Sequence, residues 1–378
     1  MNFDIIIIGS GPGGYVTAIR ASQLGFKVAI VEKESLGGVC LNWGCIPTKA
    51  LLKSAQVFDY INHAEDYGIE IKNAKANFQS VISRSRKVAD GMSKGVEFLM
   101  KKNKITVIDG FGKIKKNGRV EVINDTEHKE ITGKHIIIAT GGKSRVLPNL
   151  KQDGVKIIGY REAMTLNKMP KKMVIVGSGA IGVEFAYFYK SMGVDVTVVE
   201  YMENIVPLED ADISKELRRS FKKYGINVLT GSNVEKIEIE GEICNVTIKT
   251  KKGTENIQAD IVLSAVGIEP NTDGIGLEEV GIKTDKGKVL VDNFYKTNVE
   301  GYYAIGDILP NQSLAHVASA EGILCVEKIA GHNPEPIDYN NIPNCTYCSP
   351  EIASVGYTEE KAKEAGYELK IGKFPFSA

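Results

Sequence analysis

Residues 5–14 read IIIIGSGPGG, and this stretch decides how the first part of the chain folds. Four consecutive isoleucines are typical of a parallel strand that is buried on both faces. The glycine turn after them opens a predicted helix that ends near Gly25, and a second strand at residues 27–31 leads to Glu32. A glycine turn between a buried strand and a helix, with an acid after the next strand, is typical of dinucleotide binding.

The same pattern occurs a second time. A predicted strand at residues 173–176 is followed by GSGAIG at residues 177–182, a helix ending near Gly193, a strand at residues 195–199 and Glu200. The acid stands at the same distance from the third glycine in both copies. One such motif is weak evidence, but two copies in the same frame predict an α/β fold with two Rossmann-like dinucleotide-binding domains.

The glycines have separate roles in such a turn. The first permits the tight turn, the second lets the backbone approach a pyrophosphate, and the third lets the helix pack on the strand. The phosphates then bind at the helix N-terminus, and Glu32 and Glu200 are placed to accept hydrogen bonds from ribose hydroxyls. Residues 201–210 contain no Arg or Lys that could bind a 2′-phosphate, so the second site favours NAD over NADP.

Composition excludes several classes of protein. The chain has 378 residues and a formal net charge of zero, so nucleic acid and anionic membranes are not expected partners. No apolar run approaches the length of a membrane span, and the N-terminus does not read as a signal peptide. We therefore expect a cytosolic protein, in which six cysteines do not form a secreted disulfide framework.

The remaining segments fit around the two turns. We predict a helix over residues 78–100, and a small antiparallel meander over residues 104–130. Further strands are expected at residues 134–140, 261–266, 301–305 and 352–357, and a short helix at residues 358–365.

Two cysteines stand five residues apart, at Cys40 and Cys45. In an ideal helix their Cα atoms would be about 8.6 Å apart, whereas a disulfide needs less than about 7 Å. If they bridge, the segment cannot be regular helix, and Gly44 is suited to an irregular turn before a helix at residues 48–61. Lys49 would then favour a thiolate at Cys45; the alternative is that both cysteines are buried for packing.

Residues 37–49, GGVCLNWGCIPTK, resemble the flavin-dependent pyridine-nucleotide disulfide oxidoreductases. Residues 139–141, 267–272, 303–307 and 315–322 also match that family. Leu41 and residues 46–49 resemble the branch that oxidises dihydrolipoamide, since the glutathione and mercuric reductases usually have valine at the positions of Leu41 and Ile46. The resemblance covers nearly the whole chain.

The resemblance implies a role for each matching residue. Those implied to be catalytic are Cys40, Cys45, Lys49 and Glu184, with Lys49 paired to Glu184 beside the flavin. Those implied to bind FAD are Gly9, Gly11, Pro12, Gly13, Gly14, Glu32, Lys33, Gly38, Val39, Cys40, Lys49, Gly112, Thr140, Gly141, Asp307, Ala315 and His316. Those implied to bind NAD are Gly177, Gly179, Ala180, Ile181, Gly182, Glu184, Glu200 and Gly267.

The resemblance also implies a domain order and a reaction. FAD-binding parts are expected at residues 1–145 and 271–340. Between them, residues 146–270 are expected to form an NAD-binding domain with its own small β-meander. Residues 341–378 are expected to begin an α+β dimerisation domain. Dihydrolipoamide on a lipoyl-bearing acyltransferase would reduce a Cys40–Cys45 disulfide, and the electron pair would pass through FAD to NAD. The implied protein is a cytoplasmic or mitochondrial-matrix homodimer, the dehydrogenase component of a 2-oxo acid dehydrogenase complex.

One family element is not visible. The family uses a His–Glu pair from the C-terminal domain of the partner subunit, and no such motif includes any of the five histidines, which are His63, His128, His135, His316 and His332. We therefore expect a C-terminally truncated chain that binds FAD and NAD but has little lipoamide activity. Alternatives are another disulfide reductase, for glutathione or a metal ion, and a non-enzymatic flavin-binding fragment.

Cys345 and Cys348 form a C-x-x-C pattern, and the resemblance implies a strand at this position. Residues three apart in a strand point to opposite faces, so these two are not expected to bridge or to share a metal ion. No metal site is predicted.

Overall fold

The computed structural model of the chain describes residues 1–376, and its elements form two compact units. The first unit comprises Met1–Met169 and Val266–Tyr339, and the second comprises Pro170–Ala265 together with the chain from Asn340. Each unit contains one of the two glycine turns, so each is described by itself.

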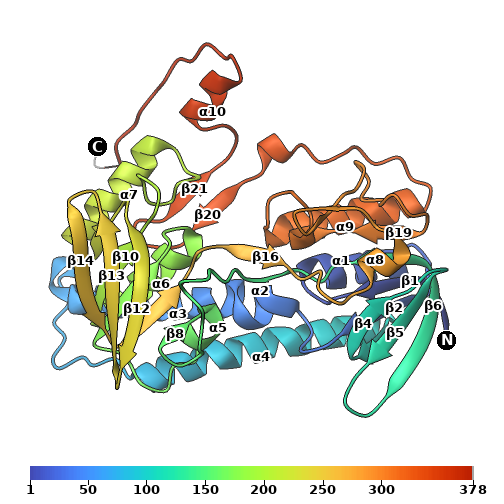
Figure 1. Ribbon diagram of the computed structural model, residues 1–378, viewed down its shortest axis with the longest axis horizontal. Coiled ribbons are helices and arrows are strands. Elements are labelled where there is room, and N and C mark those ends of the chain that lie inside the picture. Colours follow the sequence, from blue (N-terminus) through green and yellow to red (C-terminus); the bar gives the residue numbers. More distant parts are fainter. Residues whose placement is uncertain (377–378) are drawn as a thin grey trace. The chain divides into compact units, whose positions relative to one another are not determined.

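The first unit is built on a mixed sheet with strand order β3-β2-β1-β6-β5-β4 (Figure 1). Its strands are β1 (Asn2–Ile8), β2 (Val28–Glu32), β3 (Thr106–Asp109), β4 (Phe111–Ile114), β5 (Arg119–Ile123) and β6 (His128–Ile138). A further strand, β19 (Tyr302–Ala304), pairs in parallel with the end of β6. The isoleucines of β1 are buried because both faces of the sheet are covered, which is the reason for their continuous apolar run.

The first unit contains seven α-helices within the described residues. They are α1 (Pro12–Gln23), α2 (Gly38–Trp43), α3 (Cys45–Asn62), α4 (Phe78–Lys102), α5 (Tyr160–Ala163), α8 (Leu277–Val280) and α9 (Ala315–Ile329). Helices α1 and α4 contact the strands of this sheet. Figure 1 shows α1 and α9 side by side, and Arg20 of α1 pairs with Glu327 of α9 at 2.7 Å. Short elements complete the unit: η1 (Ala64–Tyr67), β7 (Gly142–Ser144), β8 (Ile157–Ile158), β16 (Ile268–Pro270), β17 (Thr284–Asp285), β18 (Lys288–Val289), η2 (Gly306–Ile308) and η3 (Tyr339–Asn341), whose last two residues fall in the second unit.

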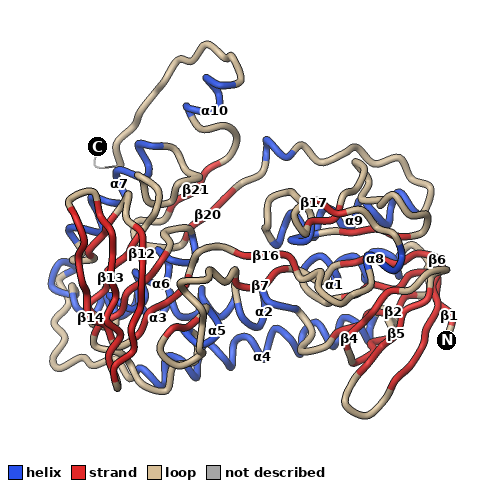
Figure 2. Tube along the Cα trace, viewed as in Figure 1, coloured by secondary structure: helices blue, strands red, loops and turns tan. Residues whose placement is uncertain are grey.

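The second unit contains parallel strands in the order β11-β10-β9-β15. They are β9 (Lys172–Val176), β10 (Asp195–Val199), β11 (Asn227–Leu229) and β15 (Ile261–Ser264), with helices α6 (Ala180–Ser191) and α7 (Ala211–Lys223). An antiparallel sheet of β12 (Asn233–Glu240), β13 (Ile243–Thr250) and β14 (Gly253–Ala259) is the expected second meander (Figure 2). From Asn340 onward the unit adds β20 (Asn344–Thr346), β21 (Ile352–Ser354) and α10 (Glu359–Glu364).

The predicted fold class is confirmed, and the differences are local. The strand at residues 106–109 is not part of a meander, because it pairs in parallel with β2 and only β4, β5 and β6 run antiparallel. The helix expected from residue 48 begins at Cys45, and the segment Gly38–Trp43 before it is also helical. Strand β21 ends at Ser354 rather than at residue 357.

No helix within residues 1–376 combines the length and the apolar character that crossing a membrane requires.

Candidate active site

Cys40 and Cys45 form a disulfide, with their Cα atoms 4.7 Å apart. Cys40 lies in α2 and Cys45 is the first residue of α3. Gly44 separates the two helices with φ −140° and ψ −112°, which are not helical angles. The prediction that bridged cysteines require a break in the helix is therefore confirmed, and the break is at Gly44.

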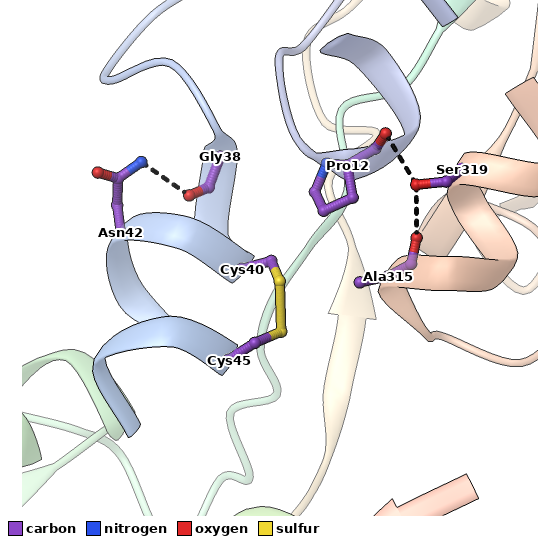
Figure 3. The surroundings of a disulfide bond; sticks show 7 residues. All are labelled: Pro12, Gly38, Cys40, Asn42, Cys45, Ala315 and Ser319. Atoms are coloured by element: carbon purple, nitrogen blue, oxygen red, sulfur yellow. Dashed lines mark hydrogen bonds between the residues drawn. A yellow bond between two sulfur atoms is a disulfide. The ribbon is translucent and has the colours of Figure 1, made fainter. Parts of the chain in front are cut away.

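The disulfide lies beside the first glycine turn. Figure 3 shows the sulfur–sulfur bond on the side of α2 and α3 that faces Pro12 and Ala315, the first residues of α1 and α9. Gly38 opens α2 directly against the turn, since a Cβ added to it would lie 2.6 Å from the Cα of Gly11. The lack of a side chain at Gly38 thus sets how closely the disulfide approaches the N-terminus of α1.

The first glycine turn leaves the N-terminus of α1 open. Gly9 has φ +99°, in the left-handed region, and a Cβ on Gly14 would lie 1.9 Å from the carbonyl oxygen of Gly9. The N-cap Gly11 provides no side-chain hydrogen bond, whereas Asn77 caps α4 by accepting from Ser80 N–H at 2.9 Å. The first N–H groups of α1 are therefore available to a pyrophosphate.

Glu32 is held by the turn that it follows. Its Oε2 accepts from the backbone N–H of Ser10 at 2.9 Å and from the Ser10 hydroxyl at 2.6 Å. Its Oε1 accepts from the backbone N–H groups of Lys33 and Glu34 at 2.8 and 2.9 Å. The carboxylate is thus fixed at the end of β2, where a ribose would lie if a pyrophosphate occupied the turn.

The second turn repeats this arrangement in its own unit. Gly177 also has φ +99°, and a Cβ on Gly182 would lie 2.0 Å from the carbonyl oxygen of Gly177. The N-cap Gly179 makes no side-chain hydrogen bond, and Ala180 and Ile181 begin α6. The backbone and side-chain groups around this turn therefore fit a second dinucleotide phosphate.

Glu200 is buried, with an exposed fraction of 7%. Its Oε2 accepts from Ser178 N–H at 2.8 Å and from the Ser178 hydroxyl at 2.7 Å, and its Oε1 accepts from Met202 N–H at 2.8 Å. The loop after it contains no basic residue, but Lys251 reaches the loop from the β13–β14 turn and pairs with Glu203. Sequence reasoning that considered only residues 201–210 missed this lysine.

Asp307 lies in η2, just after β19, at the edge of the sheet where the parallel strands have their carboxyl ends. Gly142, which follows β6, would place a Cβ 3.4 Å from Asp307 Oδ2. Burial raises the pKa of Asp307, an effect that the charge of Lys288 partly offsets. The same edge includes Thr140, whose hydroxyl donates to Asn271 O at 2.7 Å, and Gly141, whose carbonyl accepts from Asn271 N–H at 2.9 Å.

Glu321 of α9 holds the loop that carries Asp307. It is fully buried and accepts from the backbone N–H of Gly306 at 2.6 Å and from the Tyr339 hydroxyl at 2.7 Å. Burial raises the pKa of Glu321, against the opposing effect of these hydrogen bonds. Sequence reasoning missed Glu321, although residues 315–322 were among the family matches.

Lys49 and Glu184 belong to different units. Lys49 is in the first turns of α3, four residues after Cys45. Glu184 is buried in α6 and accepts from Tyr347 N–H at 2.9 Å. Their pairing stays a prediction.

Other predicted site residues have these places. Val39 is in α2, and Lys33 is exposed after β2. Gly13 packs against Ala318, and His316 is the second residue of α9. Gly112 of β4 lies against Ile8 and Val31. Gly267, which was predicted to bind NAD, belongs to the first unit, and its carbonyl accepts from Arg145 N–H at 3.0 Å.

Ser10 and Ser178 are functional candidates that sequence reasoning did not single out. Each occupies the second position of its glycine turn, so the repeat GSG itself was the signal. Cys345 and Cys348 are free, as expected, and Cys345 is exposed whereas Cys348 is buried. The expected strand is shorter than predicted, because β20 ends at Thr346 and Cys348 lies in the bend after it.

Comparison with known proteins agrees with this geometry. Residues 3–322 match the model of the pyridine nucleotide-disulphide oxidoreductase family, and residues 342–378 match that family's dimerisation domain. A dihydrolipoyl dehydrogenase of Rhizobium etli is 49% identical over 100% of this chain and 82% of its own length. The mitochondrial dihydrolipoyl dehydrogenase of Pisum sativum is 42% identical over 99% of this chain and 76% of its own.

A solved structure is similar throughout. The crystal structure of LpdA from Mycobacterium tuberculosis superposes with a TM-score of 0.89 and 27% identity, over 96% of this chain and 80% of that one. Two glycine turns, a disulfide beside the first of them and a family match over most of the length agree with one another. The chain is a member of the pyridine nucleotide-disulphide oxidoreductase family.

Proposed function

We propose that this chain catalyses electron transfer between dihydrolipoamide and NAD through the Cys40–Cys45 disulfide and a bound FAD. The observation that carries the proposal is the position of that disulfide, across the Gly44 break and facing the open N-terminus of α1. The dihydrolipoyl dehydrogenases that resemble the chain at 42–49% identity support dihydrolipoamide as the dithiol.

The residues present fit both cofactors. In the first unit, the turn around Gly9 and Gly14, the fixed Glu32 and the half-buried Asp307 would hold FAD. In the second, the turn around Gly177 and Gly182 and the fixed Glu200 would hold NAD. When bound, FAD accepts an electron pair from a thiolate and passes it as hydride to NAD. We assign the first unit, with the remaining residues of the predicted FAD set, to FAD binding. We assign the second unit, with Gly179, Ala180, Ile181 and Glu184 of the predicted NAD set, to NAD binding.

The protein's own chemistry is thiol–disulfide exchange. A substrate thiolate attacks Cys40 Sγ, the Cys40–Cys45 bond breaks, and Cys45 leaves as a thiolate. The second substrate thiol, after losing its proton, attacks the mixed disulfide, so that the substrate leaves as a cyclic disulfide and Cys40 as a thiolate. Two electrons and two protons have then left the substrate. The electrons are on the cysteine pair, and Lys49, near Cys45 in α3, would stabilise the Cys45 thiolate.

Anaerobic titration of the full chain with FAD bound tests this proposal. NADH should reduce the pair and produce a thiolate–flavin charge-transfer band. Cys45→Ser should abolish the band, whereas Cys40→Ser should leave a Cys45 thiolate and show the band before any reductant is added. Cys345→Ser, at an exposed free cysteine, is the matched control and should behave as the wild type. Equal loss of the band in Cys345→Ser and Cys45→Ser would contradict the proposal.

Substrate class is tested separately. NADH should be oxidised with lipoamide and not with glutathione disulfide, and the lipoamide rate should be low because no His–Glu motif is visible in this sequence to exchange the thiol proton. NADH should be preferred to NADPH because Glu200 repels a 2′-phosphate. Preference for NADPH with glutathione disulfide would assign the chain to another branch of the family.

We further propose a homodimer, because residues 342–378 match a dimerisation domain, and a lipoyl-bearing acyltransferase as the macromolecular partner. A reducing compartment, either cytoplasm or mitochondrial matrix, is supported by the free thiols of Cys325, Cys345 and Cys348, which occur beside one disulfide within residues 1–376.

A further inference from the structure

Trp43 is the single tryptophan of the chain and stands directly before Gly44, at the end of α2. The guanidinium carbon of Arg86, from α4, lies 4.4 Å from the centre of its ring, and that of Arg161, from α5, lies 5.1 Å from it. Both distances are within the range of a cation–π interaction. We call Trp43, Arg86 and Arg161 the Trp43 clamp.

Arg86 also holds the backbone of α2. Its Nη2 donates to the carbonyl oxygen of Asn42 at 2.5 Å. That carbonyl is among the last four of the helix, which have no partner within it, and a cation is favourable at a helix C-terminus. The Asn42 amide in turn donates to the carbonyl oxygens of Leu36 and Gly38 at 3.0 Å each, so the end of α2 is fixed from two sides.

Arg161 connects the clamp to the loop before α2. Its Nη1 donates to Glu34 Oε2 at 3.0 Å and its Nη2 to Glu34 Oε1 at 3.4 Å. The side chains of Arg161 and Glu34 are 36% and 44% exposed, so solvent screens this pair. Arg86 is the stronger part of the clamp, because it lies closer to the ring and also donates to the backbone of α2, whereas Arg161 donates to the half-exposed Glu34.

None of these contacts involves sulfur, so opening the disulfide removes none of the atoms that make them. Reduction removes the covalent link across Gly44, and a flexible junction would let the two cysteines separate. Bringing them back would cost the conformational entropy of that junction. A segment already held at Trp43 and Asn42 loses less entropy, so its disulfide re-forms more readily.

We propose that the Trp43 clamp positions the Cys40–Cys45 pair, keeping the two thiols within bonding reach in the reduced state and so lowering the reduction potential of the pair. This rests on the proposed function in one respect, that the pair opens and closes during turnover. Trp43, Arg86 and Arg161 are positioning residues, because they act on the sulfur atoms through the backbone around Gly44.

The equilibrium ratio of dithiol to disulfide measures the reduction potential of the Cys40–Cys45 pair. The holoprotein is equilibrated anaerobically with mixtures of reduced and oxidised dithiothreitol, and its free thiols are trapped and counted. Arg86→Gln should increase the ratio of dithiol to disulfide three- to tenfold in a given mixture, and a tenfold change corresponds to about 30 mV. Arg161→Gln should shift the ratio in the same direction by less.

Two further variants separate positioning from general damage. Arg86→Lys keeps a charge and a donor but loses the planar contact with the ring, so it should rescue part of the shift. Arg84→Gln is the matched control, because Arg84 lies on the same helix but donates to α3, at Ala50 O and Ser54 Oγ, 2.8 and 3.3 Å away. It should change the ratio less than twofold.

Emission of the single tryptophan gives a second readout. Reduction should leave the emission maximum of the wild type in place, because the half-buried indole keeps its two arginine neighbours. It should shift the emission maximum of Arg86→Gln to longer wavelength as the indole becomes more hydrated.

An unshifted ratio in folded, flavin-loaded Arg86→Gln would overturn the inference, as would an equal shift in Arg84→Gln. If Arg86→Gln does not fold, Arg86→Lys and Arg161→Gln decide the question by the same criterion. A wild-type disulfide that dithiothreitol cannot open would overturn the proposed function as well, whereas normal wild-type cycling with unshifted variants would overturn this inference alone.

Discussion

The two glycine turns have nearly the same backbone but different neighbours. Gly9 and Gly177 share φ +99°, and the third glycines, Gly14 and Gly182, approach the first carbonyl equally closely. In the first unit, Gly38 packs on the turn and brings the disulfide helix with it. The serine carbonyl of each turn accepts a backbone hydrogen bond at 3.0 Å, but the donor is Gly37, next to Gly38, in the first unit and Val206 in the second. Both turns therefore have a backbone that fits a dinucleotide phosphate, but only the segment packed on the first turn carries a disulfide.

The helices after the turns also differ in what they pack against. Gly13 of α1 would place a Cβ 3.3 Å from Ala318 of α9, and Gly322 of α9 would place one 1.7 Å from Thr17 Oγ1. Close approach of α1 and α9 therefore requires glycine at residue 322, whereas a Cβ at residue 13 would require only a small shift of its neighbours. The position equivalent to Gly13 in the second unit is Ile181, so that helix has no comparable constraint.

The largest expected effect comes from adding a methyl group to either third glycine. Gly14→Ala should weaken FAD binding on the order of a hundredfold, about 2.7 kcal/mol, because the Cβ would collide with the Gly9 carbonyl. Gly182→Ala should leave FAD bound but raise the KM for NADH at least tenfold. Flavin occupancy and steady-state kinetics measure the two effects.

The matched control is Gly91→Ala, because Gly91 lies within α4 and a Cβ there meets nothing within 4 Å. It should be neutral or slightly stabilising, since Ala is a better helix former than Gly. If Gly182→Ala removed FAD as well, the two turns would not serve separate cofactors.

A smaller effect is expected from the serines that hold the glutamates. Ser178→Ala removes a 2.7 Å hydrogen bond to buried Glu200, and hydrogen bonds to charged groups contribute about 1.5–3 kcal/mol. It should weaken NADH binding roughly tenfold. Ser10→Ala should weaken FAD binding by less, because Glu32 is only half-buried and keeps its three backbone donors. Titration calorimetry with each cofactor measures both.

Ser191→Ala provides the comparison for Ser178→Ala. Ser191 is also buried on α6, and its hydroxyl donates to Tyr187 O at 2.9 Å, away from the glycine turn. It should lower stability without changing the affinity for NADH. Equal losses of affinity in the two variants would mean that the Glu200 contact has no specific role.

The smallest effect concerns pH, and it is confined to the first unit. Burial raises the pKa of Asp307 above its unfolded value, so the folded protein binds the proton more tightly and loses stability as pH rises through the raised pKa. Asp307→Asn in the protein without FAD should therefore have the Tm of the wild type near pH 4 and a Tm higher by a few degrees at pH 7. Thermal melts at both values measure this difference.

Exposed Asp285 supplies the control. Asp285→Asn should show no such pH dependence. A Tm difference for Asp307→Asn that shrinks between pH 4 and pH 7 would contradict the sign of the shift.

Much of the fold was readable from local pattern. The strands, turns and helices of both dinucleotide units lie within a few residues of their predicted bounds, because buried isoleucine runs and glycine turns are determined by near neighbours. The meander was misjudged at residues 106–109, since whether a short strand pairs parallel or antiparallel depends on where the sheet places it. The helical state of residues 38–43 was missed, because six residues carry too little periodicity.

The sequence by itself determined the two glycine turns, the two acids at matching distances and the close pair of cysteines. These depend on steric limits and spacings within a few tens of residues. Only the tertiary structure decided that Gly38 sets the disulfide against the turn, that Glu321 holds the Asp307 loop, and that Arg86 and Arg161 converge on Trp43. Such contacts join residues far apart in the chain, and their geometry exists only once the sheet and its covering helices have packed.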